Sequence, residues 1–319
     1  MKDELGRRLR YTRAYKKPKN IEIGERDIAI LSLLARYRYL RKDFMLKLLG
    51  KVSEQKVTRR LRDLYDLGYI NRPEEQWRAM NARYSAAVYE LDTKGEQLLR
   101  DNELYPLELS SLTRKSRNGA IRQYPHSMMI CDTLASIEIG LMGTNHELVT
   151  WEQILTKHGT LDAENPFKMP CTISYTYPKT KKTHYAKTFI IPDGIFGIKR
   201  PDDTFSFFAL EAERGNGIWR NNLEQPSFLK KILAYQDIIS RKTYKEVLGI
   251  PNMRVLVVSP LEKRAEHMRE LVQEIIGSSN IFLFHHIPTQ DEILKAPKPF
   301  PELATSPWQR AGNDPTTLV

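Results

Sequence analysis

The sequence predicts a two-domain α/β protein, in which a helical domain with a small β-hairpin precedes a domain built on a mixed sheet flanked by helices. Apolar residues recur with helical spacing in the first third of the chain, and strand-like apolar runs alternate with helices further on. With 41% hydrophobic residues over 319 positions, the chain can fill two cores. The expected parts are a basic flexible arm (1–20), a first domain (21–104), a linker (105–118), a second domain (119–290) and a disordered tail (291–319).

Three helices are expected in the first part of the first domain, and a fourth near its end. The segment ERDIAILSLLARYRYL begins at Glu25 and places Ile28, Leu31 and Leu34 on one face. A shorter helix fits residues 41–49, and Gly50 ends it. A third helix has Ser53 as its N-cap and ends at Gly68, because serine caps helices and glycine terminates them.

The third helix carries a basic outer face, and a hairpin follows it. Tyr69-Ile70 and residues 84–91 can pair as antiparallel strands, and Thr93 caps a last helix. Three helices followed by a hairpin resemble a winged helix-turn-helix, whose third helix enters the major groove of DNA. The expected DNA-binding residues of this helix are Lys56, Arg59, Arg60 and Arg62. Winged helices also bind proteins, so a protein-binding or purely structural role stays open.

The charge of the chain is concentrated near its start. The net charge is +11, and residues 1–118 hold 27 Lys and Arg against 17 Asp and Glu, which gives +10. A localised positive surface is typical of proteins that bind the phosphates of nucleic acids, although a solvated tail gives the same count. Residues of the arm that we expect along DNA phosphates are Arg7, Arg8, Arg10, Lys16 and Lys17.

The second domain is expected to alternate helices and strands. A long apolar helix, about 122–142, should be buried against a sheet, and Pro226 opens a helix that runs to Ser240. An amphipathic helix follows at 262–276. Strands are expected at 147–151, 173–177, 185–191, 195–198, 205–210, 254–258 and 281–285. From about residue 295 the chain is proline-rich and aperiodic, which predicts disorder.

Three acidic residues stand at the ends of apolar strands in the second domain. Asp193 follows one strand, and Glu211 and Glu213 end another, where their i, i+2 spacing puts both on the same face. Converging carboxylates are costly to bury unless they face a cation, and Mg2+ or Mn2+ takes oxygen ligands. The sequence therefore predicts a metal site at Asp193, Glu211 and Glu213. A Pro-Asp-Gly turn and a solvated strand edge are the alternative interpretations.

These acids resemble the PD-(D/E)xK core of restriction endonucleases, in which an Asp, a second acid and a Lys surround the scissile phosphate. Pro192-Asp193 matches the first element and Glu211-Ala212-Glu213 the second, but Glu213 stands where the lysine should be. Either Lys230 or Lys231 on the following helix takes the place of that lysine, or the site relies on metal alone.

A longer pattern is similar to the replication-relaxation family, which includes MobC-type relaxases. It consists of the winged helix, a helix bearing His126, and the runs PDGIF, FFALEAERG and KILAY. The resemblance implies metal-dependent nicking of double-stranded DNA at the origin of a plasmid or integrative mobile element, as in plasmid mobilization and conjugation. It also allows an accessory nicking factor or a coupling ATPase as a partner, and a homo-oligomer.

Three further residues are candidates for the catalytic site. Lys231 and Tyr235 are i, i+4 neighbours on one helix face, so Lys231 could neutralise phosphate charge and Tyr235 could orient it. His126 could shuttle protons or bind metal. The structural alternatives are a lysine whose aliphatic stem lies on apolar surface, a half-buried tyrosine and a core histidine.

Several other chemistries are disfavoured. The chain has no phosphate-binding GxxxxGK[ST] loop and no GxSxG motif, and its two cysteines have no partners at zinc-ligand spacing. His285 and His286 are adjacent, which does not fit the metal clamp of relaxases that use a tyrosine nucleophile. Without a membrane span or a secretory signal, we expect a cytoplasmic protein. The rival hypotheses are a non-catalytic replication or transcription regulator with a degenerate nuclease fold, and cleavage of both DNA strands.

Overall fold

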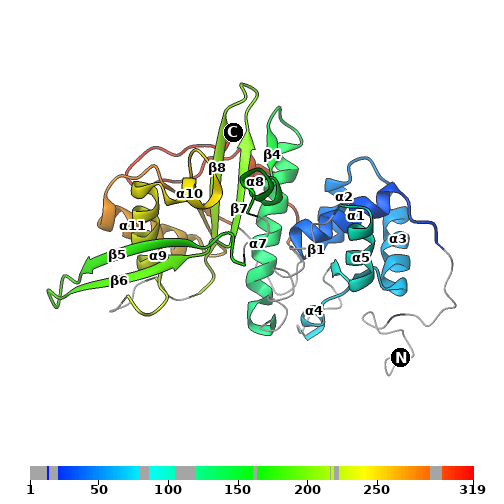
Figure 1. Ribbon diagram of the computed structural model, residues 1–319, viewed down its shortest axis with the longest axis horizontal. Helices are drawn as coiled ribbons and strands as arrows, with labels where there is room; N and C mark the ends of the chain where they lie inside the picture. Colours follow the sequence, from blue (N-terminus) through cyan, green and yellow to red (C-terminus); the bar gives the residue numbers. More distant parts are fainter. Residues whose placement is uncertain are drawn as a thin grey trace. The chain divides into compact units, whose positions relative to one another are not determined.

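A computed structural model describes residues 13, 21–78, 86–104, 120–160, 164–215, 217–218, 223–287 and 297–319. The chain forms two compact units, one of Met1–Ile139 with Asp291–Phe300 and one of Gly140–Gln290 with Pro301–Val319. Both are drawn in Figure 1. The helices and sheets confirm the predicted mixed α/β class.

The first unit combines helices with a small antiparallel sheet. Within the described ranges, β3 lies between β1 and β2 and is antiparallel to both. Ile70 pairs with Leu91, so strands are present where the hairpin was expected, although Tyr84 lies outside the described residues. The elements are α1 (Glu25–Tyr37), β1 (Leu40–Arg41), α2 (Lys42–Leu48), α3 (Glu54–Leu67), β2 (Ile70–Asn71), α4 (Glu75–Arg78), β3 (Val88–Leu91), α5 (Thr93–Asp101) and most of α7 (Ala120–Leu141).

Helix α3 forms where its sequence predicts. Val57, Leu61 and Leu64 are fully buried on its inner face. Ser53 occupies the N-cap position, and Gly68 ends the helix with a φ of 83°, a left-handed conformation that favours glycine. The opposite face of α3 is therefore free to carry charge.

The long helix α7 corrects the predicted domain boundary at residue 119. The two units divide within α7, after Ile139, and not at the expected linker, whose residues 105–118 lie outside the described ranges. Within the first unit, Arg41 pairs with Asp132, Arg36 pairs with Glu138 at 3.1 Å, and the Cys131 thiol donates to a backbone carbonyl. The sequence did not predict that most of α7 belongs to the first unit, because its pattern shows the apolar surface of the helix and not its polar partners.

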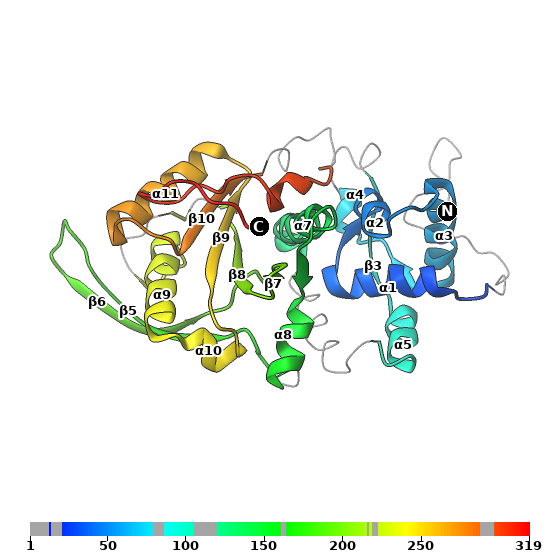
Figure 2. The same cartoon turned by 90° about the horizontal axis from the view of Figure 1, so that it is seen from above.

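The second unit is built on a mixed sheet and a two-stranded ribbon (Figure 2). In the described ranges the sheet has the order β10-β9-β8-β7-β4, with β8, β9 and β10 parallel and β4 and β7 antiparallel to their neighbours. The strands are β4 (Glu147–Val149), β5 (Met169–Thr176), β6 (Thr183–Ile190), β7 (Gly194–Lys199), β8 (Phe205–Ala212), β9 (Arg254–Ser259) and β10 (Phe282–His286). The helices are α8 (Trp151–His158), α9 (Phe228–Arg241), α10 (Thr243–Leu248), α11 (Glu262–Ile276) and the short 3-10 helix η2 (Pro301–Ala304).

The main core of the second unit lies between this sheet, β5 and the helices α9 and α11. Phe207 and Ala209 of β8 belong to it, as do Phe228 of α9 and Phe282 of β10. Because side chains alternate along a strand, the next residue of β8 on the same face is Glu211. The apolar row of β8 therefore continues into a carboxylate.

The C-terminal segment is ordered over residues 297–319, so the predicted disordered tail is wrong there. Trp308 is fully buried, and its indole N–H donates to the carbonyl of Leu303 at 2.9 Å. Gln309 forms a β-bridge with Phe284 of β10, and Leu318 is also buried. The segment is mostly neither helix nor strand and is anchored by a few large side chains, so its sequence shows no periodicity. No helix in the described parts of the chain is long and apolar enough to cross a membrane.

Candidate active site

Asp193 lies beside the carboxyl end of β8. Gly194 pairs with Leu210 across β7 and β8, so the antiparallel register brings Asp193 opposite Glu211. The Asp193 amide donates to the Leu210 carbonyl at 3.0 Å, and its Oδ2 accepts from the Ala212 amide at 2.8 Å. The backbone of β8 therefore fixes both the main chain and the carboxylate of Asp193.

Glu211 is a carboxylate buried in the core. It is 1% exposed, its Oε2 accepts from the Lys231 ammonium, and its Oε1 accepts from the Tyr235 hydroxyl. Burial raises the pKa of Glu211 to about 7, although Lys231 lowers it, and the neighbouring Asp193 raises it further. Lys231 therefore favours the ionised form of Glu211, and a further cation beside Glu211 would favour it more.

Lys231 and Tyr235 reach the cluster from one face of α9. Burial alone would lower the pKa of Lys231, but Glu211 and Glu213 more than offset this, so its pKa is raised and it stays charged. Burial and the charge of Glu211 raise the pKa of Tyr235 well above its usual value. Tyr235 is therefore a neutral hydrogen-bond donor, and α9 supplies one cation and one hydroxyl to Glu211.

Glu213 is held between two cations. Its Oε1 accepts from Lys231 Nζ at 2.7 Å, and its Oε2 accepts from Arg264 Nη2 at 3.3 Å. Sequence reasoning missed Arg264, which lies on α11 and is only 8% exposed. The sequence feature that could have indicated Arg264 is its position four residues before Met268, which places it on the apolar face of an amphipathic helix.

The carboxylate oxygens of this cluster are suitable ligands for a hard divalent cation, but the three acids are not arranged as one metal site. In the ranges that the structure describes, no three His, Cys, Asp or Glu residues are placed to hold a metal ion. Lys231 contacts the carboxylates of both glutamates, and Arg264 holds Glu213. Mg2+ is often bound by one or two carboxylates together with substrate phosphate, so Asp193 and Glu211 fit such an ion.

The remaining catalytic candidate, His126, lies on α7 in the first compact unit, whereas the cluster lies in the second. Its side chain is half-buried. Its role as a proton shuttle or metal ligand stays a prediction.

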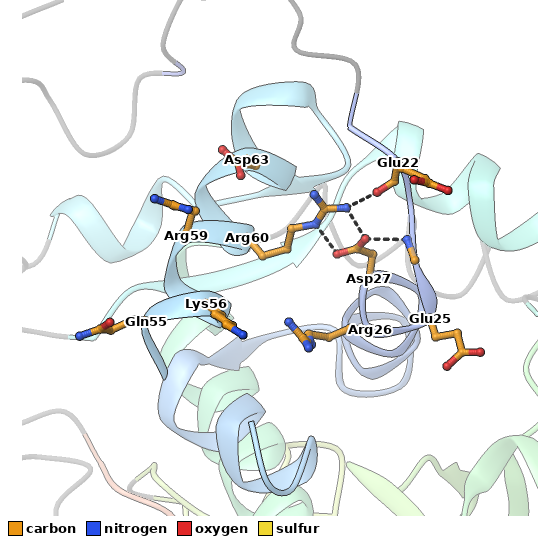
Figure 3. Close-up of a pocket in the computed structure, with 10 residues that line it drawn as sticks. Glu22, Glu25, Arg26, Asp27, Gln55, Lys56, Arg59, Arg60 and Asp63 are labelled. Carbon is orange, nitrogen blue, oxygen red and sulfur yellow. Dashed lines mark hydrogen bonds and ion pairs between the residues drawn. The ribbon is translucent and has the colours of Figure 1, made fainter. Parts of the chain in front are cut away.

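The basic face of α3 divides into exposed and paired residues. Lys56, Arg59 and Arg62 are exposed, as expected. Arg60 was expected to point away from the unit and does not, because its Nε donates to Asp27 of α1 at 2.6 Å and it also binds the Glu22 carbonyl (Figure 3). The arm residues Arg7, Arg8, Arg10, Lys16 and Lys17 lie outside the described residues.

A hollow of about 750 Å³ lies between α3 and the start of α1. Figure 3 shows Lys56 and Arg59 on the α3 side and Arg26 on the α1 side, with the ion pair of Arg60 and Asp27 between the helices. This ion pair joins α1 to α3 and so supports the helix that carries the exposed cations.

One comparison with known proteins identifies the family. A family model described as replication-relaxation matches residues 31–252, which is more than half of the 319-residue chain. The chain belongs to the replication-relaxation family, which indicates a role in the replication or relaxation of DNA. We found no significant match among curated proteins or solved structures. The matched range includes Asp193, Glu211 and Lys231 but not Arg264.

Proposed function

We propose that this protein is a metal-dependent DNA-nicking endonuclease that acts at an origin of a mobile element. The observation that carries the proposal is Glu211, a carboxylate buried in an apolar row of β8, beside Asp193 and bonded to Lys231 and Tyr235. A buried charge is costly, and groups with strongly shifted pKa values are concentrated at functional sites. The family assignment supports DNA as the substrate.

The residues of the cluster have distinct roles in this proposal. Asp193 and Glu211 would hold Mg2+ or Mn2+, which when bound would lower the pKa of water and share the charge of the phosphate. Lys231, with its side chain 31% exposed, is the cation that contacts the scissile phosphate. Glu213 and Arg264 position Lys231, and Tyr235 orients Glu211. Lys231 thus takes the role that the strand lysine has in PD-(D/E)xK nucleases.

The first unit would bind the duplex in a winged-helix manner. Exposed Lys56, Arg59 and Arg62 on α3 support this role, because basic side chains on a recognition helix contact phosphates and base edges of the major groove. The strand to be nicked would then reach Asp193 and Glu211.

A plasmid assay tests the proposal. Supercoiled plasmid carrying the cognate origin should become open-circular with Mg2+ or Mn2+, and Asp193→Ala or Glu211→Ala should slow this by about 100-fold or more. Asp202→Ala is the matched control, because Asp202 is an exposed acid in the turn between β7 and β8. Undiminished nicking by both site variants would contradict the proposal, and a linear product would indicate cleavage of both strands.

The second candidate is a non-catalytic DNA-binding regulator. It is favoured by the contacts of Lys231 and Arg264 with the glutamates, which compensate their charge without a metal. Calorimetric titration with Mn2+ separates the two. A nuclease should bind Mn2+ and lose that binding in Asp193→Ala, whereas a regulator should show no binding that depends on Asp193.

A further inference from the structure

Strands β5 and β6 form an antiparallel ribbon in the second unit, separate from its main sheet. In Figures 1 and 2 the turn between them extends past α9 and α11. One face of the ribbon packs on the core through Met169, Cys171 and Ile173. We call the opposite face the ribbon face, and its members are Pro170, Thr172, Ser174, Tyr185, Lys187 and Phe189.

Two aromatic rings are exposed on the ribbon face. Tyr185 is 76% exposed and Phe189 49%, and they are the aromatic members among the exposed large hydrophobic residues of the described ranges. They lie on one side of β6 because they are separated by four residues. Lys168 Nζ lies 4.3 Å from the Phe189 ring centroid. The face therefore offers flat apolar rings with a cation beside one of them.

The ribbon is uniformly basic. Residues 168–190 contain five lysines and no Asp or Glu. Lys187 lies between the two rings on β6, and Lys179, Lys181 and Lys182 lie around the turn. An acid of a neighbouring helix, Asp237 of α9, accepts from the Thr172 amide and pairs with Arg241. The ribbon itself therefore has no acidic side chain to neutralise its lysines.

We propose that the ribbon face binds single-stranded DNA, with bases stacked on Tyr185 and Phe189 and phosphates at the lysines. Exposed rings combined with a basic surface are the features by which proteins hold unpaired strands, because every base has a face that can stack. Paired bases in a duplex cannot offer their faces to two such rings. An anionic membrane fits less well, because Thr172, Ser174 and Lys187 interrupt the apolar surface.

The ribbon leads directly to the candidate active site. β6 ends at Ile190, and Asp193 follows three residues later, before β7. A strand bound along β6 would therefore run toward Asp193 and Glu211. This step rests on the proposed function, whereas the binding of single-stranded DNA by the ribbon does not.

The stacking of bases on the two rings is tested by measuring DNA binding under conditions in which no nicking occurs. Anisotropy of a fluorescent oligothymidine is measured with the full chain in EDTA, so that no metal-dependent cleavage occurs. The double variant Tyr185→Ala with Phe189→Ala should raise Kd by about tenfold or more. Tyr185→Phe with Phe189→Tyr keeps both rings and should bind as the wild type does. Leu261→Ala removes an exposed apolar side chain of the same unit, 52% exposed, and should leave Kd unchanged.

The lysines are tested by the salt dependence of the same binding. Lys181→Ala with Lys182→Ala should weaken binding and reduce the slope of log K against log salt by about 1.4, because each phosphate contact with a single strand contributes about 0.7. The aromatic double variant should leave this slope unchanged. Lys245→Ala with Lys263→Ala removes two exposed lysines of α10 and α11 and serves as the control.

Three results would overturn the inference. The aromatic double variant could bind oligothymidine as the wild type does, it could lose duplex binding to the same extent, or it could lose binding to phosphatidylserine vesicles and keep binding to DNA. Thermal unfolding of each variant should match the wild type, since both rings are exposed. If the wild type bound oligothymidine but did not nick cognate plasmid with Mg2+ or Mn2+, the proposed function alone would be contradicted.

Discussion

Two buried carboxylates, Asp27 in the first unit and Glu211 in the second, serve different ends. Asp27 is 3% exposed, accepts from the Gly24 amide at 2.9 Å and pairs with Arg60, so it begins α1 and joins it to α3. Glu211 is 1% exposed, and in the described part of the chain its carboxylate hydrogen-bonds only to two side chains of α9, those of Lys231 and Tyr235. The fold accounts for Asp27, whereas an apolar residue at position 211 would continue the core of β8. The comparison teaches that a buried charge indicates function when it neither caps a helix nor bonds to a backbone group.

The largest expected effect concerns proton uptake by Glu211. Its folded-state pKa is raised from 4.5 to about 7, so the folded protein binds one more proton than the unfolded chain between these values. The free energy of unfolding should therefore fall as pH rises from about 4.5 to about 7, by up to about 3 kcal/mol at 1.36 kcal/mol per pKa unit. Urea unfolding of wild type and Glu211→Gln in EDTA measures this. A Gln variant that keeps the full decline would show that another group causes it.

A smaller effect is expected when Lys231 is removed. Lys231→Met leaves Glu211 without its cation and Glu213 with Arg264 alone, which should lower the free energy of unfolding at pH 8 by about 2 kcal/mol. Protonation of Glu211 limits the loss, so it should shrink toward pH 5. Lys230→Met changes the neighbouring residue, whose side chain pairs with neither glutamate in the described part of the chain, and should stay within about 0.5 kcal/mol of wild type. Equal losses of unfolding free energy in both variants would show that the contacts of Lys231 with the glutamates do not stabilise the fold.

The smallest effect distinguishes two adjacent arginines of α3. Arg60→Ala should lower the free energy of unfolding by about 1 kcal/mol, because it leaves the buried Asp27 without its ion pair. Arg59→Ala should leave stability unchanged and weaken duplex binding, with a salt-dependence slope smaller by about 0.9. Thermal unfolding and anisotropy with a labelled duplex measure the two properties. The division of α3 would be wrong if Arg59→Ala destabilised the protein and Arg60→Ala did not.

Local patterns were enough to predict much of both units. Ser53 and Gly68 bounded α3, and continuous apolar runs located β8 and β9. The carboxylates of Asp193 and Glu211 could be placed on neighbouring strands because antiparallel register follows from a short turn. The i, i+4 spacing of Lys231 and Tyr235 placed both on one face of α9.

Other features depended on contacts between segments distant in sequence. The pattern of α3 did not distinguish Arg60 from Arg59, because only the position of Asp27 on α1 decides which arginine is paired. The tail at 297–319 has no periodicity, and Trp308 is ordered by a surface that other segments build. Arg264 joined the cluster through the packing of α11 on the sheet.

The sequence by itself determined most of the helices and strands, though not α8 or α10, together with the basic outer face of α3 and the three acids near the end of β8. Only the tertiary structure decided that Lys231 contacts both glutamates, that Arg264 holds Glu213 and that Asp27 neutralises Arg60. The physical reason is that periodicity reports which side of an element is buried. It carries no information about which charge from another element will be buried against it.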